Sequence, residues 1–141
     1  MSTFTGKRLR YLLIAVAVVL VLVVAGWSVW PSKSGPVVLK TGTPQHLVTV
    51  AIDSLRIGDT AVDVRVTDRA GAPIDHAAVR VQAVQQVMGH AGEPIPMTAA
   101  GDGHFRAPTL SLMMAGPWEL RLSIDAHHGI DDVTVPLWVG G

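Results

Sequence analysis

Residues 11–30 form an uninterrupted apolar run, YLLIAVAVVLVLVVAGWSVW, without a single charged side chain. About 20 apolar residues in a helix are enough to cross the hydrocarbon core of a membrane. Lys7, Arg8 and Arg10 precede the run, and basic residues favour the cytoplasmic side. The sequence therefore predicts a protein of the cell membrane with a cytoplasmic tail at 1–10, a single transmembrane anchor at 11–30 and an extracytoplasmic chain after it.

A cleaved signal peptide is the alternative for the same segment. Val23 and Ala25 offer a small-residue cleavage site, but the apolar run is longer than the core of a signal peptide, which is about 7 to 15 residues. This length favours a retained anchor. The stretch PSKSGP at 31–36 contains two prolines and a glycine, a composition typical of a linker. We therefore expect the folded domain at 37–141.

The composition restricts both the partners and the chemistry of this domain. The 141-residue chain contains no cysteine, which excludes disulfides, zinc ribbons and thiol nucleophiles, so a metal site must use His, Met, Asp or Glu. From Pro31 onward there are eight basic and eleven acidic residues, a net charge of −3. This charge, together with only 5% aromatic residues, argues against nucleic acid as a partner.

Alternation of apolar and polar residues predicts an all-β domain. Val62, Val64 and Val66 alternate with polar residues, and a second such run begins at Trp118, which is the pattern of strands with one buried face. Turn sequences rich in glycine and aspartate separate the runs. We expect an immunoglobulin-like sandwich of two sheets and about seven strands. The expected strands are 46–53, 62–66, 77–85, 96–100, 103–107, 118–125 and 132–138.

Methionine and histidine cluster in one part of the predicted domain. Four of the five methionines lie between 88 and 114, and two histidines fall in the same stretch. Thioether sulfur and imidazole nitrogen favour Cu(I), whereas Mg²⁺ and Ca²⁺ favour oxygen ligands. Copper, as Cu(I), is therefore the metal that this stretch predicts.

Met88 and His90 are the central pair of the predicted site. They flank Gly89, and residues i and i+2 of an extended segment point to the same side, so both side chains can reach one ion. The further candidate ligands are Met97, Met113, Met114 and His104.

Each further candidate has a structural alternative. Methionine is a flexible core filler, so these three methionines can serve packing instead. His104 follows a GDG turn and fits an outward-facing strand position. His127 and His128 lie in the sequence AHHG, where a hairpin turn with solvated side chains is expected.

Short motifs in this stretch resemble the YtkA-like family, which is related to FixH-like proteins. They are MGH at 88–90, GDGHF at 101–105 and MAGPW at 114–118, and the resemblance extends over residues 45–140. It implies an immunoglobulin-like domain, exported or membrane-anchored, with a role in copper supply to cytochrome oxidase or in copper resistance. Relatives often carry further methionines just before the MGH motif, where this chain has VQQV at 84–87.

Three classes of function are weighed on these features. The first, which we favour, is a membrane-anchored protein that binds copper and carries Cu(I) to a protein acceptor. The second is a metal-free interaction module that uses the loop at 87–96 to assist assembly of a membrane complex. An enzyme is not expected, because adjacent Asp131 and Asp132 alternate faces in a strand and no nucleophile and base can be paired. A small-molecule substrate is not expected either.

Overall fold

The computed structural model describes residues 16–19 and 35–141 of the chain. Residues 16–19 are helical, and no helix within these described ranges is long and apolar enough to span a membrane. The predicted tail at 1–10 and most of the predicted anchor at 11–30 lie outside the described residues. Residues 31–34 of the predicted linker lie outside them too.

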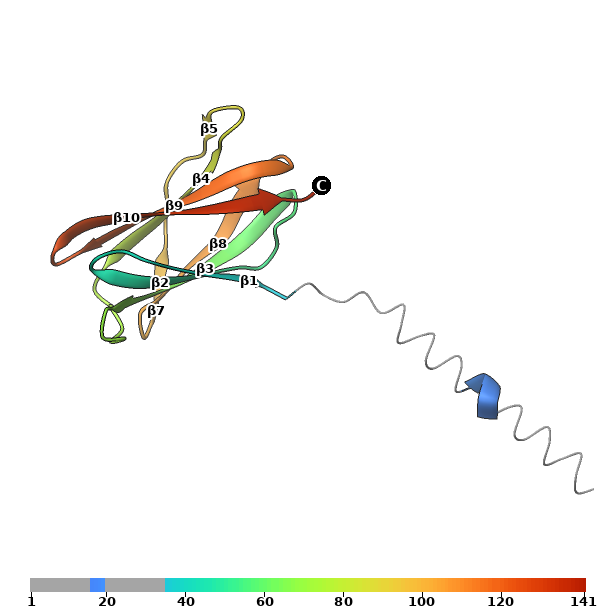
Figure 1. Cartoon of the computed structure of the whole chain (residues 1–141), viewed down its shortest axis with the longest axis horizontal. Helices are drawn as coiled ribbons and strands as arrows, with labels where there is room; N and C mark the ends of the chain where they lie inside the picture. The colour runs from blue at the N-terminus through green and yellow to red at the C-terminus, as the bar shows by residue number, and fades with distance from the viewer. Residues whose placement is uncertain (1–15, 20–34) are drawn as a thin grey trace, which may run out of the picture. The chain divides into compact units, whose positions relative to one another are not determined.

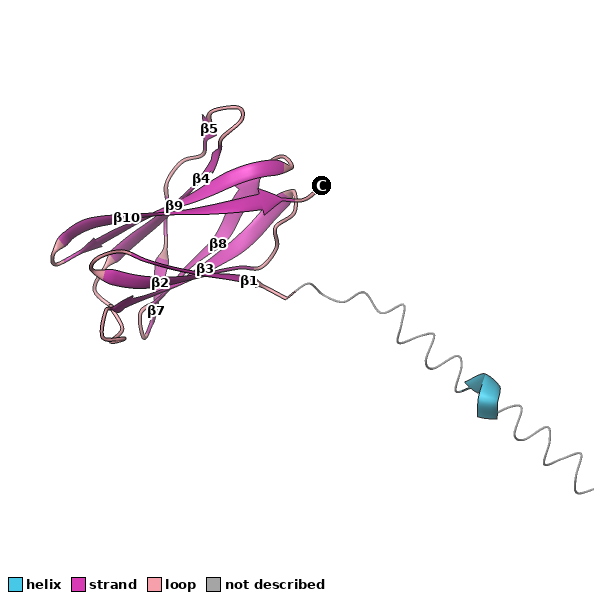
Figure 2. Ribbon diagram, in the orientation of Figure 1, coloured by secondary structure: helices cyan, strands magenta, loops and turns pink. Residues whose placement is uncertain are grey.

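Residues 35–141 build two antiparallel sheets that pack face to face (Figures 1 and 2). One sheet has the order β1-β2-β3-β8-β7 and the other the order β10-β9-β4-β5, with β6 also paired to β4. The first sheet consists of β1 (Val37–Gly42), β2 (His46–Ile52), β3 (Gly58–Asp68), β8 (His104–Leu112) and β7 (Thr98–Gly101). The second consists of β10 (Gly129–Val139), β9 (Gly116–Ala126), β4 (Ala78–Gln85), β5 (His90–Ala91) and β6 (Ile95–Pro96).

The core lies between the two sheets and is built by the alternation seen in the sequence. Burial alternates with exposure along β8 and β9, so each strand contributes one row of apolar side chains to the interior. Phe105 of β8 and Trp118 of β9 are the largest of these, and both are buried. The all-β prediction is confirmed as two antiparallel sheets.

Residues 35–141 form ten strands where the sequence predicted about seven. β1 was not predicted because its half-buried residues give no clear alternation of apolar and polar side chains. The expected strand at 96–100 is divided between the sheets: β6 pairs with β4, and β7 pairs with β8. Met97 lies at the crossing point, where its backbone N–H donates to the carbonyl of Val79 at 2.8 Å.

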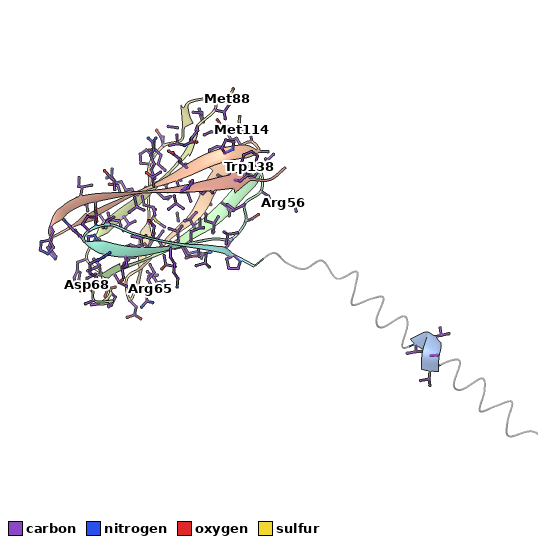
Figure 3. The ribbon with its side chains drawn as sticks, in the orientation of Figure 1. Arg56, Arg65, Asp68, Met88, Met114 and Trp138 are labelled. Atoms are coloured by element: carbon purple, nitrogen blue, oxygen red, sulfur yellow. The ribbon has the colours of Figure 1, made fainter. Side chains whose placement is uncertain are left out.

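Chain direction defines two opposite ends of this domain. β4 ends at Gln85, β8 ends at Leu112 and β9 begins at Gly116, and the register of Gln85 with Trp118 places these points at one end. β2 begins at His46 at the opposite end, where the turn at 127–128 joins β9 to β10. Figure 3 shows Met88 and Met114 at the first end and Asp68 at the second.

Candidate metal centre

The turn between β4 and β5 presents Met88 and His90. Residues 86–89 form the turn, and Gly89 has φ +64°, a conformation that glycine adopts without strain. The Met88 side chain is 68% exposed. His90 is exposed and pairs with Gln85 across the hairpin. Directly paired residues project from the same face of a sheet, so His90 shares the face of Gln85, which is turned toward the other sheet.

A second loop brings two more methionines to the same end. Residues 113–115 cross from β8 in one sheet to β9 in the other. Met113 is 70% exposed and Met114 is 37% exposed, so neither fills the core beneath Trp118. We call the set Met88, His90, Met113 and Met114 the methionine end.

Two buried side chains hold both loops of the methionine end. Gln85 is only 3% exposed, and its Oε1 accepts a hydrogen bond from the backbone N–H of Met88 at 2.7 Å. Its Nε2 lies 3.8 Å from the place that a Cβ on Gly116 would take. The neighbouring Trp118 donates its indole N–H to the carbonyl of Met114 at 3.0 Å. The two loops are therefore fixed against one pair of residues, Gln85 and Trp118.

The donor set of the methionine end is soft. It offers three thioethers, which need no deprotonation to bind a metal, and one imidazole, and this combination suits Cu(I) better than hard cations. Within residues 16–19 and 35–141, no group of three or more His, Cys, Asp or Glu is placed to hold a metal ion. A site at this end would therefore depend on sulfur.

The structure does not bring Met97 and His104 to the methionine end. Met97 is 9% exposed and belongs to the core cluster. Its partner Val79 lies six residues before Gln85 in β4, about 20 Å along the strand. His104 is exposed at the start of β8, about 26 Å along that strand from Leu112.

A buried histidine at the opposite end was not singled out from the sequence. His46 is 3% exposed, and its Nδ1 lies 2.9 Å from Oδ2 of Asp131. The Thr43 hydroxyl donates to the same carboxylate oxygen. Alternation along β2 predicts that His46 faces inward with Val48, but its partner Asp131 is 85 residues away, which no local pattern reveals.

The network lowers the pKa of Asp131. Burial by itself raises the pKa of the carboxyl, but the hydrogen bonds from Thr43 and His46 and the attraction of His46 bring it below its ordinary value. The carboxylate form is the one that accepts these bonds. Because His46 lies in one sheet and Asp131 in the other, this pair links the two sheets.

The FixH family model matches residues 47–130, more than half of the chain. The chain belongs to the FixH family. This finding confirms the predicted relation to FixH-like proteins. The FixH match contains all four residues of the methionine end. His46 lies just before the first matched residue, and Asp131 just after the last. No match is found among curated proteins.

Solved structures are similar to this chain, and the first of the two described here shows the same fold. One is a copper-bound variant of FetP from uropathogenic Escherichia coli strain F11, with a TM-score of 0.58 and 11% identity, over 76% of this FixH-family chain and 92% of FetP. Another is the crystal structure of an engineered protein, with a TM-score of 0.48 and 20% identity, over 78% of this chain and 21% of that one.

Proposed function

We propose that this protein binds Cu(I) at the methionine end and carries it to a protein acceptor. The observation that supports this most is the placement of exposed Met88 and Met114 on two loops that share the buried pair Gln85 and Trp118. Membership in the FixH family and the fold shared with copper-bound FetP add support for a copper-related role.

The exposure of the ligands suits transfer rather than storage. Met88 and Met113 are largely exposed, so an ion bound by them remains within reach of ligands on a second protein. Soft thioether ligands select Cu(I) by type, and partial enclosure leaves a path for release. We therefore assign the chain to carriers, with an acceptor that is itself a copper-binding protein.

The proposal also includes the cellular localisation and the immunoglobulin-like arrangement that the sequence predicts. We place the sandwich outside the cytoplasm, held to the cell membrane by 11–30, and we regard its arrangement as immunoglobulin-like. No catalytic step is part of the proposal. A protease-accessibility measurement on intact and lysed spheroplasts tests the orientation: the domain should be cleaved in both if it is extracytoplasmic and only after lysis if it is cytoplasmic.

The test of copper binding is a competitive Cu(I) titration of the full chain in detergent solution under reducing conditions. A chromophoric Cu(I) chelator of known affinity serves as the competitor. We expect one equivalent of Cu(I) to bind. Met88→Leu and His90→Ala should each weaken binding by about tenfold or more, because each removes a ligand.

Matched variants separate this site from nonspecific binding. Met97→Leu changes a buried methionine and His127→Ala a histidine of the distant turn, so both should leave the Cu(I) affinity unchanged. Binding that survives both Met88→Leu and His90→Ala, or a failure to compete with the chelator, would overturn the carrier proposal. A metal-free interaction module would then be favoured, because Val87 on the same hairpin is 72% exposed.

A further inference from the structure

Of the two ring nitrogens of the buried His46, Nδ1 is hydrogen-bonded to Asp131, whereas Nε2 has no hydrogen-bond partner among the described residues. Nδ1 faces Oδ2 of Asp131 at 2.9 Å, and an ionised carboxylate only accepts hydrogen bonds, so Nδ1 carries the proton. In the neutral ring, Nε2 then keeps its lone pair. A carboxylate that orients a histidine in this way is the usual support of a metal-ligating imidazole.

Nε2 of His46 reaches an open cleft. Within residues 35–141, no hydrogen bond to this nitrogen is present, and no buried side-chain nitrogen or oxygen lacks a partner. Nε2 must therefore contact solvent space. The cleft that His46 lines has a volume of about 780 Å³. Its walls are formed by Gln45, His46, Asp68, Arg69, Ala70, Ile74 and His128.

The second imidazole in this cleft comes from the turn between β9 and β10. His128 lies three residues before Asp131 on the same hairpin and is exposed. The other charged side chains of the cleft are already engaged: Asp68 Oδ1 accepts from the backbone N–H groups of Ala70 and Ala72. The guanidinium of Arg69 donates to the carbonyl of Thr43 at 3.2 Å.

We propose that Nε2 of His46 and the imidazole of His128 bind a divalent metal ion of the class that prefers nitrogen ligands: Zn²⁺, Ni²⁺ or Cu²⁺. Among the described residues, no group of three or more His, Cys, Asp or Glu is placed to hold a metal ion, so the remaining coordination positions are open to water or to a group from another molecule. This site is separate from the methionine end in position and in ligand type. It does not depend on the proposed Cu(I) function.

Zn²⁺ is the probe for this site because it is redox-inert and its usual protein ligands are imidazole, thiolate and carboxylate rather than thioether. We would titrate the full chain in detergent solution with Zn²⁺ by calorimetry and follow the histidine side-chain nitrogens by NMR. We expect one equivalent to bind with a shift of Nε2 of His46. His128→Ala should weaken binding by about tenfold or more. His127→Ala, the matched neighbour in the same turn, should have no effect.

Three outcomes would overturn the site: no Zn²⁺ binding, an equal loss in His127→Ala and His128→Ala, or binding that leaves Nε2 of His46 unshifted. Because His128 is exposed, its variant should fold normally, whereas His46→Gln loses a buried contact. A Met88→Leu/His90→Ala double variant should bind Zn²⁺ as the unmodified chain does. That result separates failure of this site from failure of the Cu(I) site.

Discussion

The two ends of the sandwich use histidine in opposite environments. His90 lies exposed on a hairpin at the same end as three methionines, while His46 is 3% exposed and is hydrogen-bonded to a carboxylate from the other sheet. At the methionine end, Gln85 accepts a hydrogen bond from the backbone of Met88 and Trp118 donates one to the backbone of Met114, so the loops are fixed through their backbone. We call the opposite end the histidine end (Thr43, His46, His128 and Asp131). There the hydrogen bonds fix the side chains of Thr43, His46 and Asp131.

The two ends therefore differ in which part of the chain is held rigid, the loop backbone at one and the buried side chains at the other. A soft site that exchanges its metal needs accessible sulfur on loops of defined position, and it contributes little to holding the sheets together. A buried polar pair between sheets must be fully satisfied, because an unpaired buried group costs about 1–3 kcal/mol. We therefore expect substitutions at the histidine end to lower stability more than matched substitutions at the methionine end.

The largest expected difference is between two turn glycines, Gly103 near the histidine end and Gly89 at the methionine end. Both have positive φ, +74° and +64°. A Cβ on Gly103 would overlap the carbonyl oxygen of Val66 and lie 3.1 Å from Cβ of Pro73, whereas nothing lies within 4 Å of one on Gly89.

We expect Gly103→Ala to lower the free energy of unfolding by about 3 kcal/mol, from backbone strain and the clash together. Gly89→Ala should cost about 1 kcal/mol from strain alone. Urea denaturation followed by tryptophan fluorescence measures both values. Equal losses in the two variants would mean that the two ends are packed alike.

Asp131→Ala removes the acceptor shared by His46 and Thr43 and leaves a buried ring N–H without a partner. We expect the free energy of unfolding to fall by about 2 kcal/mol. Asp132→Ala is the matched control, since Asp132 is the exposed neighbour in the same strand, and it should change stability by less than about 0.5 kcal/mol. A comparable loss in both variants would show that the pair His46 and Asp131 does not add to the free energy of unfolding.

The lowered pKa of Asp131 predicts a pH dependence for the same link. A carboxyl whose folded pKa lies below its unfolded value, about 3.9, contributes stability that is fully present above the unfolded pKa and lost as pH falls through the folded pKa. The stability advantage of the unmodified protein over Asp131→Asn should therefore shrink as pH is lowered from about 4. Urea denaturation over this range, with chelator present, measures it. A constant advantage down to about pH 2 would contradict the assignment.

Local sequence patterns predicted the main strands and the hairpin that carries Met88 and His90, but not the contacts that join distant strands. The alternation at 62–66 and from Trp118 predicted β3 and β9, because one face of each strand is buried. The placement of Met88 and His90 on one hairpin could be predicted because only Gly89 separates them in the sequence. Met97 could not be placed, since its burial depends on pairing with Val79 in another strand. The partner of His46 follows only from how the two sheets pack.

The smallest effect on stability is expected from oxidation of the methionines, whose side chains differ widely in exposure. Met88 and Met113 are 68% and 70% exposed, Met114 is 37% exposed, and Met97 is 9% exposed. Dilute peroxide followed by peptide mass mapping should oxidise Met88 and Met113 first, Met114 next and Met97 last, because conversion to the sulfoxide requires access to sulfur.

Oxidation of the exposed methionines should shift the free energy of unfolding by less than about 0.5 kcal/mol and abolish Cu(I) competition, since a sulfoxide has no thioether sulfur to offer. Ag⁺, a redox-inert substitute for Cu(I), should protect Met88 and Met114 and leave the slow rate of Met97 unchanged. If Met97 were oxidised as fast as Met88, the core would have to open often enough to expose the Met97 sulfur as readily as the loop exposes that of Met88. Such a result would contradict the distinction between the exposed methionines of the methionine end and the buried Met97.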